Sequence, residues 1–276
     1  MKLRSLLYVP ASSEKFIAKA HERGADAIIL DLEDAVAPAD KDRARAALAE
    51  AVPAVGRSGA KVFVRVNAEP NMQLADAEAA CRAGAFGLYV AKTRSLEQLW
   101  RLSDHIEPLE RELGRAELAF VPLIEDAAAV LEARTFARYD RTLALTSGGE
   151  DLAASMGAEP LPDVLRLPKL MIHLAAKAEG RLSLGTLGST TNYSDLDGVA
   201  AAAREARMHG FDGASCVHPS VVPVLNGAFM PSDEQVAWAR RVIEAVEANG
   251  EGAFALDGKM IDAPIVTRAR NILAQA

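Results

Sequence analysis

The chain has 276 residues, half of them hydrophobic and a quarter charged, which is the composition of a globular protein with a large core. Its net charge of −7 and isoelectric point near 5.4 argue against nucleic-acid binding as the main function, because that function needs a basic surface. The two cysteines, Cys81 and Cys216, lack metal-ligand spacing, and no apolar stretch is long enough to cross a bilayer. We therefore expect a cytoplasmic protein with reduced thiols and without a membrane or nucleic-acid partner.

Short apolar runs alternate with amphipathic, alanine-rich segments, which is the pattern of βα units around a parallel sheet. Strands are predicted near Leu6, Ile28, Val64, Tyr89, Val121, Leu143, Leu184 and Ser215. Helices are predicted over 13–23, 40–52, 71–84, 95–113, 127–139, 165–179 and 195–209. Eight strands and the lack of a GxGxxG turn favour an α/β fold of the closed (β/α)₈ TIM-barrel type over an open doubly wound sheet.

The chain continues beyond the eighth predicted strand for longer than one barrel needs. The segment 231–233 is typical of the start of a long helix, and the final residues predict another, smaller helix. We therefore divide the chain into a barrel of residues 1–226 and a C-terminal helical extension of residues 227–276. This extension is expected to act as a lid or as an arm exchanged between subunits.

Acidic residues gather where the predicted strands end, and the active site of a TIM barrel lies at that end. The predicted tips carry Asp31, Glu33, Asp34, Arg65, Asn67, Lys92, Glu125, Asp126, Glu150 and Asp151. Crowded carboxylates repel one another unless a cation joins them, and oxygen ligands without nearby histidine or cysteine suit Mg²⁺. Glu125 and Asp151 follow consecutive strands and are the predicted metal ligands. The alternative is that Glu125 and Asp126 only cap the next helix.

Arg65 lies within an otherwise apolar strand, VFVRV, where a guanidinium group is costly unless it is paired. We predict that it binds a substrate carboxylate or stabilises an oxyanion. The alternative is a structural ion pair with an acid at the mouth of the barrel.

Several motifs resemble the citrate lyase β-subunit-like family, which belongs to a superfamily of Mg²⁺-dependent CoA-thioester lyases that includes malyl-CoA and citramalyl-CoA lyases. They are spread from residue 4 to residue 270 and read RSLLYVPA, GADAIILDLEDAVAPADKDRAR, FVRVNA, PLIED, GGEDLAASMG, FDGASCVHPSVV, PSDEQVAWARRV and DGKMIDAPIVTRAR. The resemblance implies a TIM barrel that assembles as a trimer or a dimer of trimers.

The resemblance also implies roles for individual residues. Glu125 and Asp151 match the metal ligands of the family, and Glu125 is expected to face the substrate as well. Arg65 matches its substrate-binding arginine, while Glu33 and Asp34 match acids that support the water shell of the metal. The resemblance therefore selects the same metal-binding pair as strand position does.

Three further residues acquire roles from the resemblance. Asp262 matches an aspartate that reaches into the active site of a neighbouring subunit, where we expect it to act as the catalytic base, although the sequence alone indicates a helix cap. Lys41 and Arg45, four residues apart on one predicted helix, are expected to bind the CoA phosphates, with a solvated helix face as the alternative. The chain departs from the family pattern at YVAK and at LGSTTNYSDLDG, which puts substrate choice in doubt.

Together these features predict a Mg²⁺-dependent lyase that cleaves a 3-hydroxy-3-carboxyacyl thioester, with citramalyl-CoA as the first choice. The products would be acetyl-CoA and pyruvate. Three other enzyme activities remain open: a citrate lyase β subunit acting on a citryl acyl carrier protein, a malyl-CoA lyase, and an aldolase acting on free acids. In a different class, the chain would be a non-catalytic barrel subunit of a larger complex.

Overall fold

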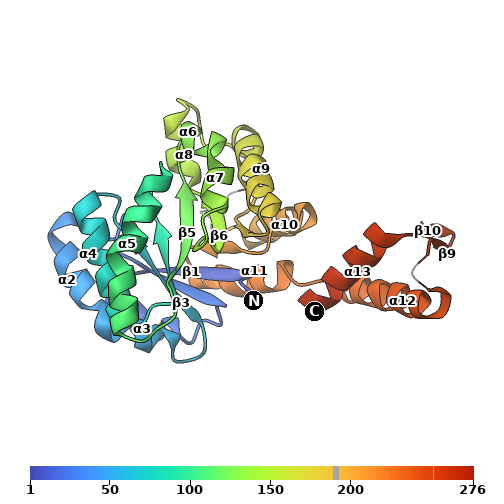
Figure 1. The fold of residues 1–276 in the computed structure, drawn as a ribbon, viewed down its shortest axis with the longest axis horizontal. Helices are drawn as coiled ribbons and strands as arrows, with labels where there is room; N and C mark the ends of the chain where they lie inside the picture. The colour runs from blue at the N-terminus through green and yellow to red at the C-terminus, as the bar shows by residue number, and fades with distance from the viewer. Residues whose placement is uncertain (189–192, 251) are drawn as a thin grey trace.

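Eight parallel strands form a barrel in the computed structural model, which describes residues 1–188, 193–250 and 252–276 (Figure 1). The strands are β1 Ser5–Pro10, β2 Ala27–Asp31, β3 Lys61–Val66, β4 Gly87–Val90, β5 Ala119–Ile124, β6 Ala144–Ser147, β7 Leu182–Leu184 and β8 Ala214–Cys216. They pair in chain order, and β1 also pairs with β8. Between β7 and β8, the backbone N–H of Gly185 donates to the carbonyl of Gly213 at 2.8 Å and completes the ring. The predicted barrel is confirmed.

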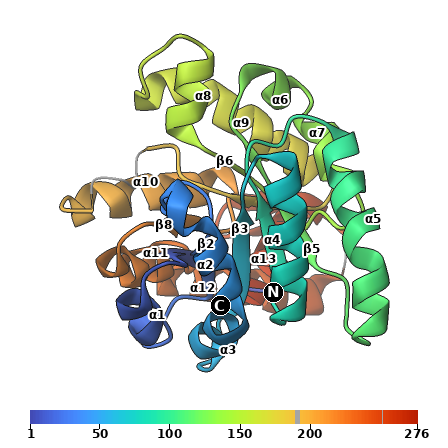
Figure 2. The same cartoon turned by 90° about the vertical axis from the view of Figure 1, so that its left-hand side faces the viewer.

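Helices surround the strands, as Figure 2 shows. They are α1 Glu14–Ala20, α2 Lys41–Ala46, α3 Leu48–Gly56, α4 Pro70–Arg82, α5 Leu96–Glu112, α6 Ala127–Leu131, α7 Ala133–Ala137, α8 Gly149–Ser155, α9 Pro162–Ala178, α10 Leu196–His209 and α11 Val222–Ala228, with 3₁₀ turns at Pro38–Asp40 and Pro219–Val221. The helices predicted over 40–52 and 127–139 are each divided in two. Helices α8 and α11 were not predicted because two turns are too short to display a periodicity.

Alternate residues of each strand enter two different cores. Phe63 of β3 points into the barrel, where its ring meets the edge of Tyr89, while Val62 and Val64 pack outward against the helices. This alternation follows from the two-residue repeat of a strand. Because apolar side chains fill both cores, most of the charged residues of the strands lie at their ends. None of the described helices has the length and apolar character of a membrane span.

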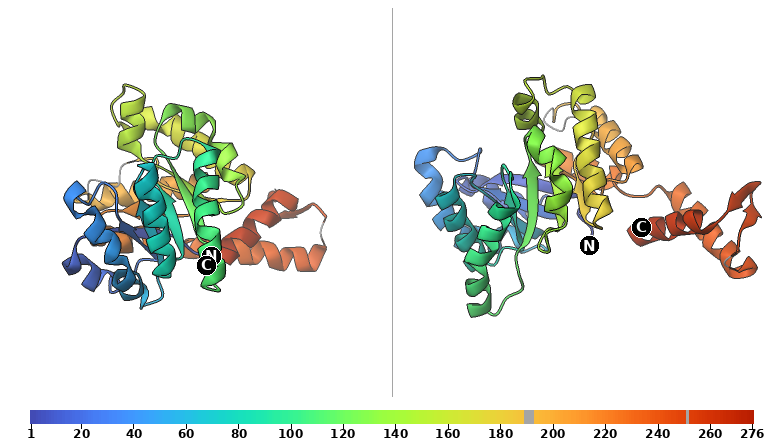
Figure 3. Two further views of the ribbon diagram at one scale, coloured as in Figure 1. Left: turned by 60° about the vertical axis from the view of Figure 1, so that its left-hand side comes forward. Right: turned by 45° about the horizontal axis from the view of Figure 1, so that its top comes forward.

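The C-terminal residues form an arm that projects from the barrel (Figures 1 and 3). The arm consists of α12 Asp233–Asn249, a hairpin of β9 Phe254–Leu256 and β10 Lys259–Ile261, and α13 Ala263–Gln275. Helix α12 starts with a capping box formed by Ser232 and Gln235, as its sequence suggests. The arm has a small core of its own around Val242 and Ile272. The boundary expected at residue 226 falls within α11, whose Leu225 is buried in the barrel core.

Candidate active site

A cavity of about 510 Å³ opens at the C-terminal ends of the strands. Its charged lining residues are Asp31, Asp34, Arg65, Glu125, Glu150 and Asp151. The cavity therefore gathers most of the acids predicted at the strand tips. It lies where TIM barrels carry their active sites.

Glu125 directly follows β5 and is 5% exposed. Its Oε2 accepts a hydrogen bond at 2.6 Å from the backbone N–H of Lys92, which has a φ of 48°. Its other oxygen lies against Gly148, where a Cβ atom would come within 2.5 Å of Oε1. Burial, reinforced by the charges of Glu33 and Asp151, raises the pKa of Glu125 to about 7. Glu125 is thus a buried carboxylate whose charged form is disfavoured by its surroundings.

Arg65 lies among three carboxylates. Its Nε and Nη2 donate to the two oxygens of Asp31 at 2.8 and 2.6 Å, a bidentate pair. Its Nη1 lies 2.9 Å from an oxygen of Glu33 and 3.0 Å from one of Asp34. Burial alone would lower the pKa of Arg65, but the bonds and charge of Asp31 raise it above its ordinary value. The ion-pair alternative is therefore realised in this structure, and a role toward substrate stays a prediction.

Lys92 and Asp31 are two site residues to which the sequence assigned no role. The ammonium group of Lys92 donates to Glu33 at 2.7 Å, and this bond raises the pKa of Lys92. Asp31 also accepts the backbone N–H groups of Glu33 and Ala35, so it shapes the loop after β2 as well as holding Arg65. Both lie at predicted strand tips. That position was the available signal for them.

Asp151 lies in the first turn of α8, four residues after the end of β6. It lines the same cavity as Glu125, and its charge contributes to the raised pKa of that residue. The two predicted metal ligands are therefore brought to one cavity. Among the described residues, no group of three or more histidine, cysteine, aspartate or glutamate side chains is arranged to hold a metal ion.

The chemistry of this donor set fits Mg²⁺. The ion commonly takes one or two protein carboxylates and keeps water or substrate in its other positions, so a cage of three protein ligands is not required. The position of Glu125 favours a cation, since this buried carboxylate shares a cavity with Asp151, and burial and the neighbouring acids raise its pKa. The assignment of Glu125 and Asp151 as ligands stays a prediction.

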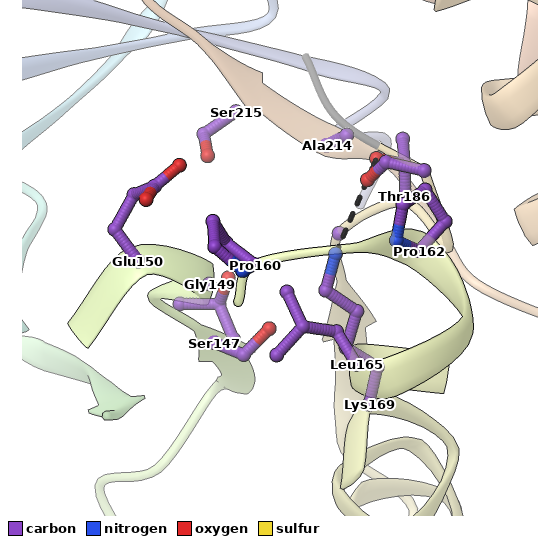
Figure 4. A pocket seen from close by; sticks show the side chains of 13 residues that line it. Ser147, Gly149, Glu150, Pro160, Pro162, Leu165, Lys169, Thr186, Ala214 and Ser215 are labelled. Carbon is purple, nitrogen blue, oxygen red and sulfur yellow. Dashed lines mark hydrogen bonds between the residues drawn. The ribbon is translucent and has the colours of Figure 1, made fainter. Parts of the chain in front are cut away.

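A side cavity of about 110 Å³ adjoins the mouth and shares Glu150 and Ser215 with it. Figure 4 shows these two residues on one side and Lys169 of α9 on the other. The ammonium group of Lys169 donates to the carbonyl of Gly188 at 3.1 Å. Burial lowers the pKa of Lys169. The sequence did not single out this lysine because it lies inside a predicted helix, without a motif around it.

The two basic residues predicted to bind CoA have partners within the chain. Lys41 donates to the carbonyls of Leu32 and Glu33 at 2.6 and 2.5 Å and so fastens the loop after β2. Arg45 pairs with the buried Asp76 at 2.6 Å. Their contact with CoA stays a prediction. Of the divergent segment LGSTTNYSDLDG, residues 189–192 lie outside the described part of the chain.

Asp262 lies on the arm and caps α13, where it accepts the backbone N–H of Ile265 at 3.4 Å. The cap indicated by its sequence is thus present. It does not line the cavity of its own chain, because the arm points away from the barrel (Figure 1). A role in the site of a neighbouring subunit stays a prediction.

The barrel and its acidic mouth agree with comparisons to known proteins. Residues 4–219 match the model of the family described as HpcH/HpaI aldolase/citrate lyase. The chain belongs to this family, which confirms the resemblance in its motifs.

Two known proteins and one crystal structure are similar to this chain over nearly its whole length. The citrate lyase subunit beta-like protein of Mycobacterium tuberculosis is 36% identical over 278 residues, covering 98% of this chain and 94% of that protein. The (3S)-malyl-CoA thioesterase of Cereibacter sphaeroides is 32% identical over 279 residues, covering 99% and 94%. The crystal structure of CitE from M. tuberculosis in complex with magnesium, acetoacetate and coenzyme A has a TM-score of 0.81 and 34% identity, covering 98% and 97%.

Proposed function

We propose that the protein is a Mg²⁺-dependent lyase that splits the carbon–carbon bond of a 3-hydroxy-3-carboxyacyl thioester. Citramalyl-CoA is the proposed substrate, and acetyl-CoA and pyruvate are the products. The observation that carries the proposal is that Glu125, Asp151 and Arg65 line one cavity at the mouth of the barrel. The similar CitE structure, solved with magnesium, acetoacetate and coenzyme A, supports the same chemistry.

Glu125 and Asp151 would hold the metal, and Glu33 and Asp34 would order its water ligands. When bound, Mg²⁺ would polarise the hydroxyl and carboxylate oxygens of the substrate. Glu125 is well placed for this task because the backbone N–H of Lys92 holds its Oε2 and the absence of a side chain at Gly148 leaves room for its Oε1. A ligand held in this way loses little freedom when it binds an ion.

Arg65 would stabilise the negative charge that develops on the thioester oxygen when the bond breaks. Asp31 holds Nε and Nη2, so Nη1 is the nitrogen available to the substrate. Nη1 contacts the buried Glu33 and also Asp34, and of these two partners it is Asp34, whose side chain is 59% exposed, that can return to water. The arginine would therefore keep its orientation while exchanging one partner.

The reaction requires a base that removes the proton from the substrate hydroxyl. Asp262 of a neighbouring subunit would remove the proton from the substrate hydroxyl, and the electrons of the broken carbon–carbon bond would pass to the thioester as an enolate. The proton taken up by Asp262 would then be returned to the enolate carbon, directly or by exchange with water, which yields the acetyl thioester and regenerates the base. This assignment requires a homo-oligomer, and we propose a trimer or a dimer of trimers. Lys41 and Arg45 would give up their hydrogen bonds within the chain in order to bind the CoA phosphates.

The first experiment is a substrate screen with purified protein. Citramalyl-, malyl- and citryl-CoA and a citryl acyl carrier protein would be supplied with Mg²⁺ or after EDTA treatment. Pyruvate, glyoxylate and oxaloacetate report cleavage, and free CoA thiol reports hydrolysis, the activity in the name of the C. sphaeroides relative. We expect pyruvate from citramalyl-CoA only with Mg²⁺. Thiol release without a 2-oxo acid would replace the lyase by a thioesterase.

A second experiment tests the metal ligands. Glu125→Ala and Asp151→Ala should lose Mn²⁺ binding and activity together. Asp126→Asn is the matched control, because Asp126 caps α6 through the backbone N–H of Ala129 and asparagine caps equally well. Undiminished Mn²⁺ binding in both alanine variants would contradict the assignment. Full absence of activity from the wild-type protein on every thioester would leave an aldolase acting on free acids and a non-catalytic subunit as the alternatives.

A further inference from the structure

Arg207 is a partly buried arginine without a carboxylate partner among the described residues, and unlike Arg115 and Arg181, which donate to backbone carbonyls instead, it keeps a buried nitrogen unpaired. Arg4, Arg45, Arg65 and Arg141 each pair with a carboxylate, and each has a raised pKa. For Arg207 no ion pair is found within the described residues, and burial lowers its pKa. A guanidinium group removed from water without a counter-charge is costly.

The hydrogen bonds of Arg207 are also incomplete. Its Nη2 donates to Oε1 of Gln235 at 2.8 Å, but its Nε is buried and has no acceptor in the described part of the chain. It is the only arginine there with such a buried, unpaired nitrogen. Buried donors in proteins are normally satisfied, so the acceptor of this nitrogen is expected to come from outside the chain, as water, an ion or a ligand.

Arg207 lines a cavity of about 490 Å³ at the junction of α10, α11 and the segment leading to α12. Arg204, one turn earlier on the same face of α10, lines it too and forms no ion pair among the described residues. The acid in the lining is Asp197, ten residues from Arg207, which corresponds to about 15 Å along the helix axis. The end of the cavity at Arg207 therefore carries positive charge.

The rest of the lining is mainly apolar. Leu196 and Met230 lie at the cavity with 37% and 43% of their surface exposed, and Pro223, Val224 and Ala228 of α11 form another part of the wall. A concave apolar surface with a few converging polar groups is the usual form of a small-molecule site, and its volume lies in the usual range.

We propose that this cavity is a second ligand site, separate from the barrel mouth, that binds a small oxyanion. The ligand would carry a phosphate or carboxylate group against Arg207 and Arg204, and its remaining atoms would lie on the apolar wall. The site does not depend on the proposed lyase activity. It lies at the base of the arm, since Oε1 of Gln235 accepts both Arg207 and the backbone N–H of Ser232, the N-cap of α12.

The test compares the wild-type protein with Arg207→Gln. Arg240→Gln is the matched control, since Arg240 is an exposed arginine of α12 that does not line the cavity. Inorganic phosphate and isobutyrate are the probes, titrated by calorimetry without divalent metal and at constant ionic strength. We expect one saturable site per chain in the wild-type and control proteins. Arg207→Gln should weaken binding at least tenfold.

The melting temperature supplies a second measurement. A ligand that binds only the native state raises it, so the probe should stabilise the wild-type and control proteins but not Arg207→Gln. If Arg207→Gln does not fold, Arg204→Gln, at an exposed position, serves instead and should weaken binding severalfold. Tighter phosphate than isobutyrate binding would identify a phosphate site, and the reverse a carboxylate site.

Two outcomes would overturn the proposal. One is the absence of saturable binding of either probe to the wild-type protein, or equal binding by Arg207→Gln. The other is a change in oligomeric state of Arg207→Gln in sedimentation velocity, combined with no probe binding. In that case the acceptor is a carboxylate of a second copy of the chain.

Discussion

Replacing Gly148 by alanine should displace Glu125 and weaken metal binding. Gly148 has φ and ψ of −93° and 106°, which alanine also adopts, so the backbone itself is not strained by the change. The new Cβ would lie 2.5 Å from Oε1 and 2.8 Å from Cγ of Glu125. Ordinary contact begins near 3.4 Å, so the carboxylate has to retreat by roughly 1 Å.

A retreat of this size breaks the 2.6 Å hydrogen bond from the backbone of Lys92 to Glu125. A bond to a charged group contributes about 1.5–3 kcal/mol, so we expect metal affinity to fall about 10–100-fold. Mn²⁺ titration followed by electron paramagnetic resonance measures this loss. Gly149→Ala is the neighbouring control, since its Cβ would meet only the end of the Leu165 side chain at 3.2 Å. Equal affinities of the two variants would refute the idea that Gly148 makes room for the carboxylate.

A change of pH and substitutions of Glu125, Asp31 and Asp262 should each alter a different measured property. In the metal-free protein, burial raises the pKa of Glu125 from 4.5 to about 7, so the free energy of unfolding should fall by about 3 kcal/mol as the pH rises through that window. Urea titrations should show this slope in the wild-type protein and a flatter one in Glu125→Gln. Asp31→Asn weakens the bidentate hold on Arg65, and we expect a loss of about 2–3 kcal/mol in unfolding free energy and a raised KM. Asp262→Asn keeps the cap of α13 and metal binding but should lose turnover. Co-assembly of Asp262→Asn with Glu125→Ala should restore part of the activity, and no recovery in mixed oligomers would place the base elsewhere.

The strands of the barrel were predictable because their apolar runs are short and bounded by glycine or polar residues. The helices were less so. The segment 127–139 reads as one amphipathic helix, but the backbone of Glu132, with φ and ψ of −95° and 2°, leaves the helical region and divides it into α6 and α7. The β9–β10 hairpin of the arm was missed because its strands are short and mostly not buried, so they lack the apolar run that marks the equally short β7 and β8.

The acids of the site could be found from the sequence because strand ends meet at one rim of a barrel. Their partners could not be found in this way. That Arg65 takes Asp31 as its bidentate partner depends on side-chain geometry, since β2 and the loop after it offer three acids within 3.0 Å. Lys169 and Arg207 were missed for a different reason. A lone basic residue on a helix looks solvated in sequence, and only packing shows that its charge is partly buried.

The charge of the mouth indicates an order of binding. Asp31, Glu33, Asp34, Glu125 and Asp151 gather there, whereas Arg65 and Lys92 are the cations paired with them. Because the carboxylates outnumber these cations, the metal-free cavity repels an anionic thioester. A divalent ion between Glu125 and Asp151 would reduce this excess of three negative charges to one, which weakens the repulsion of the thioester. We therefore expect the metal to bind first, so that the KM of the thioester falls as Mg²⁺ is raised while the affinity for Mg²⁺ alone stays measurable without substrate.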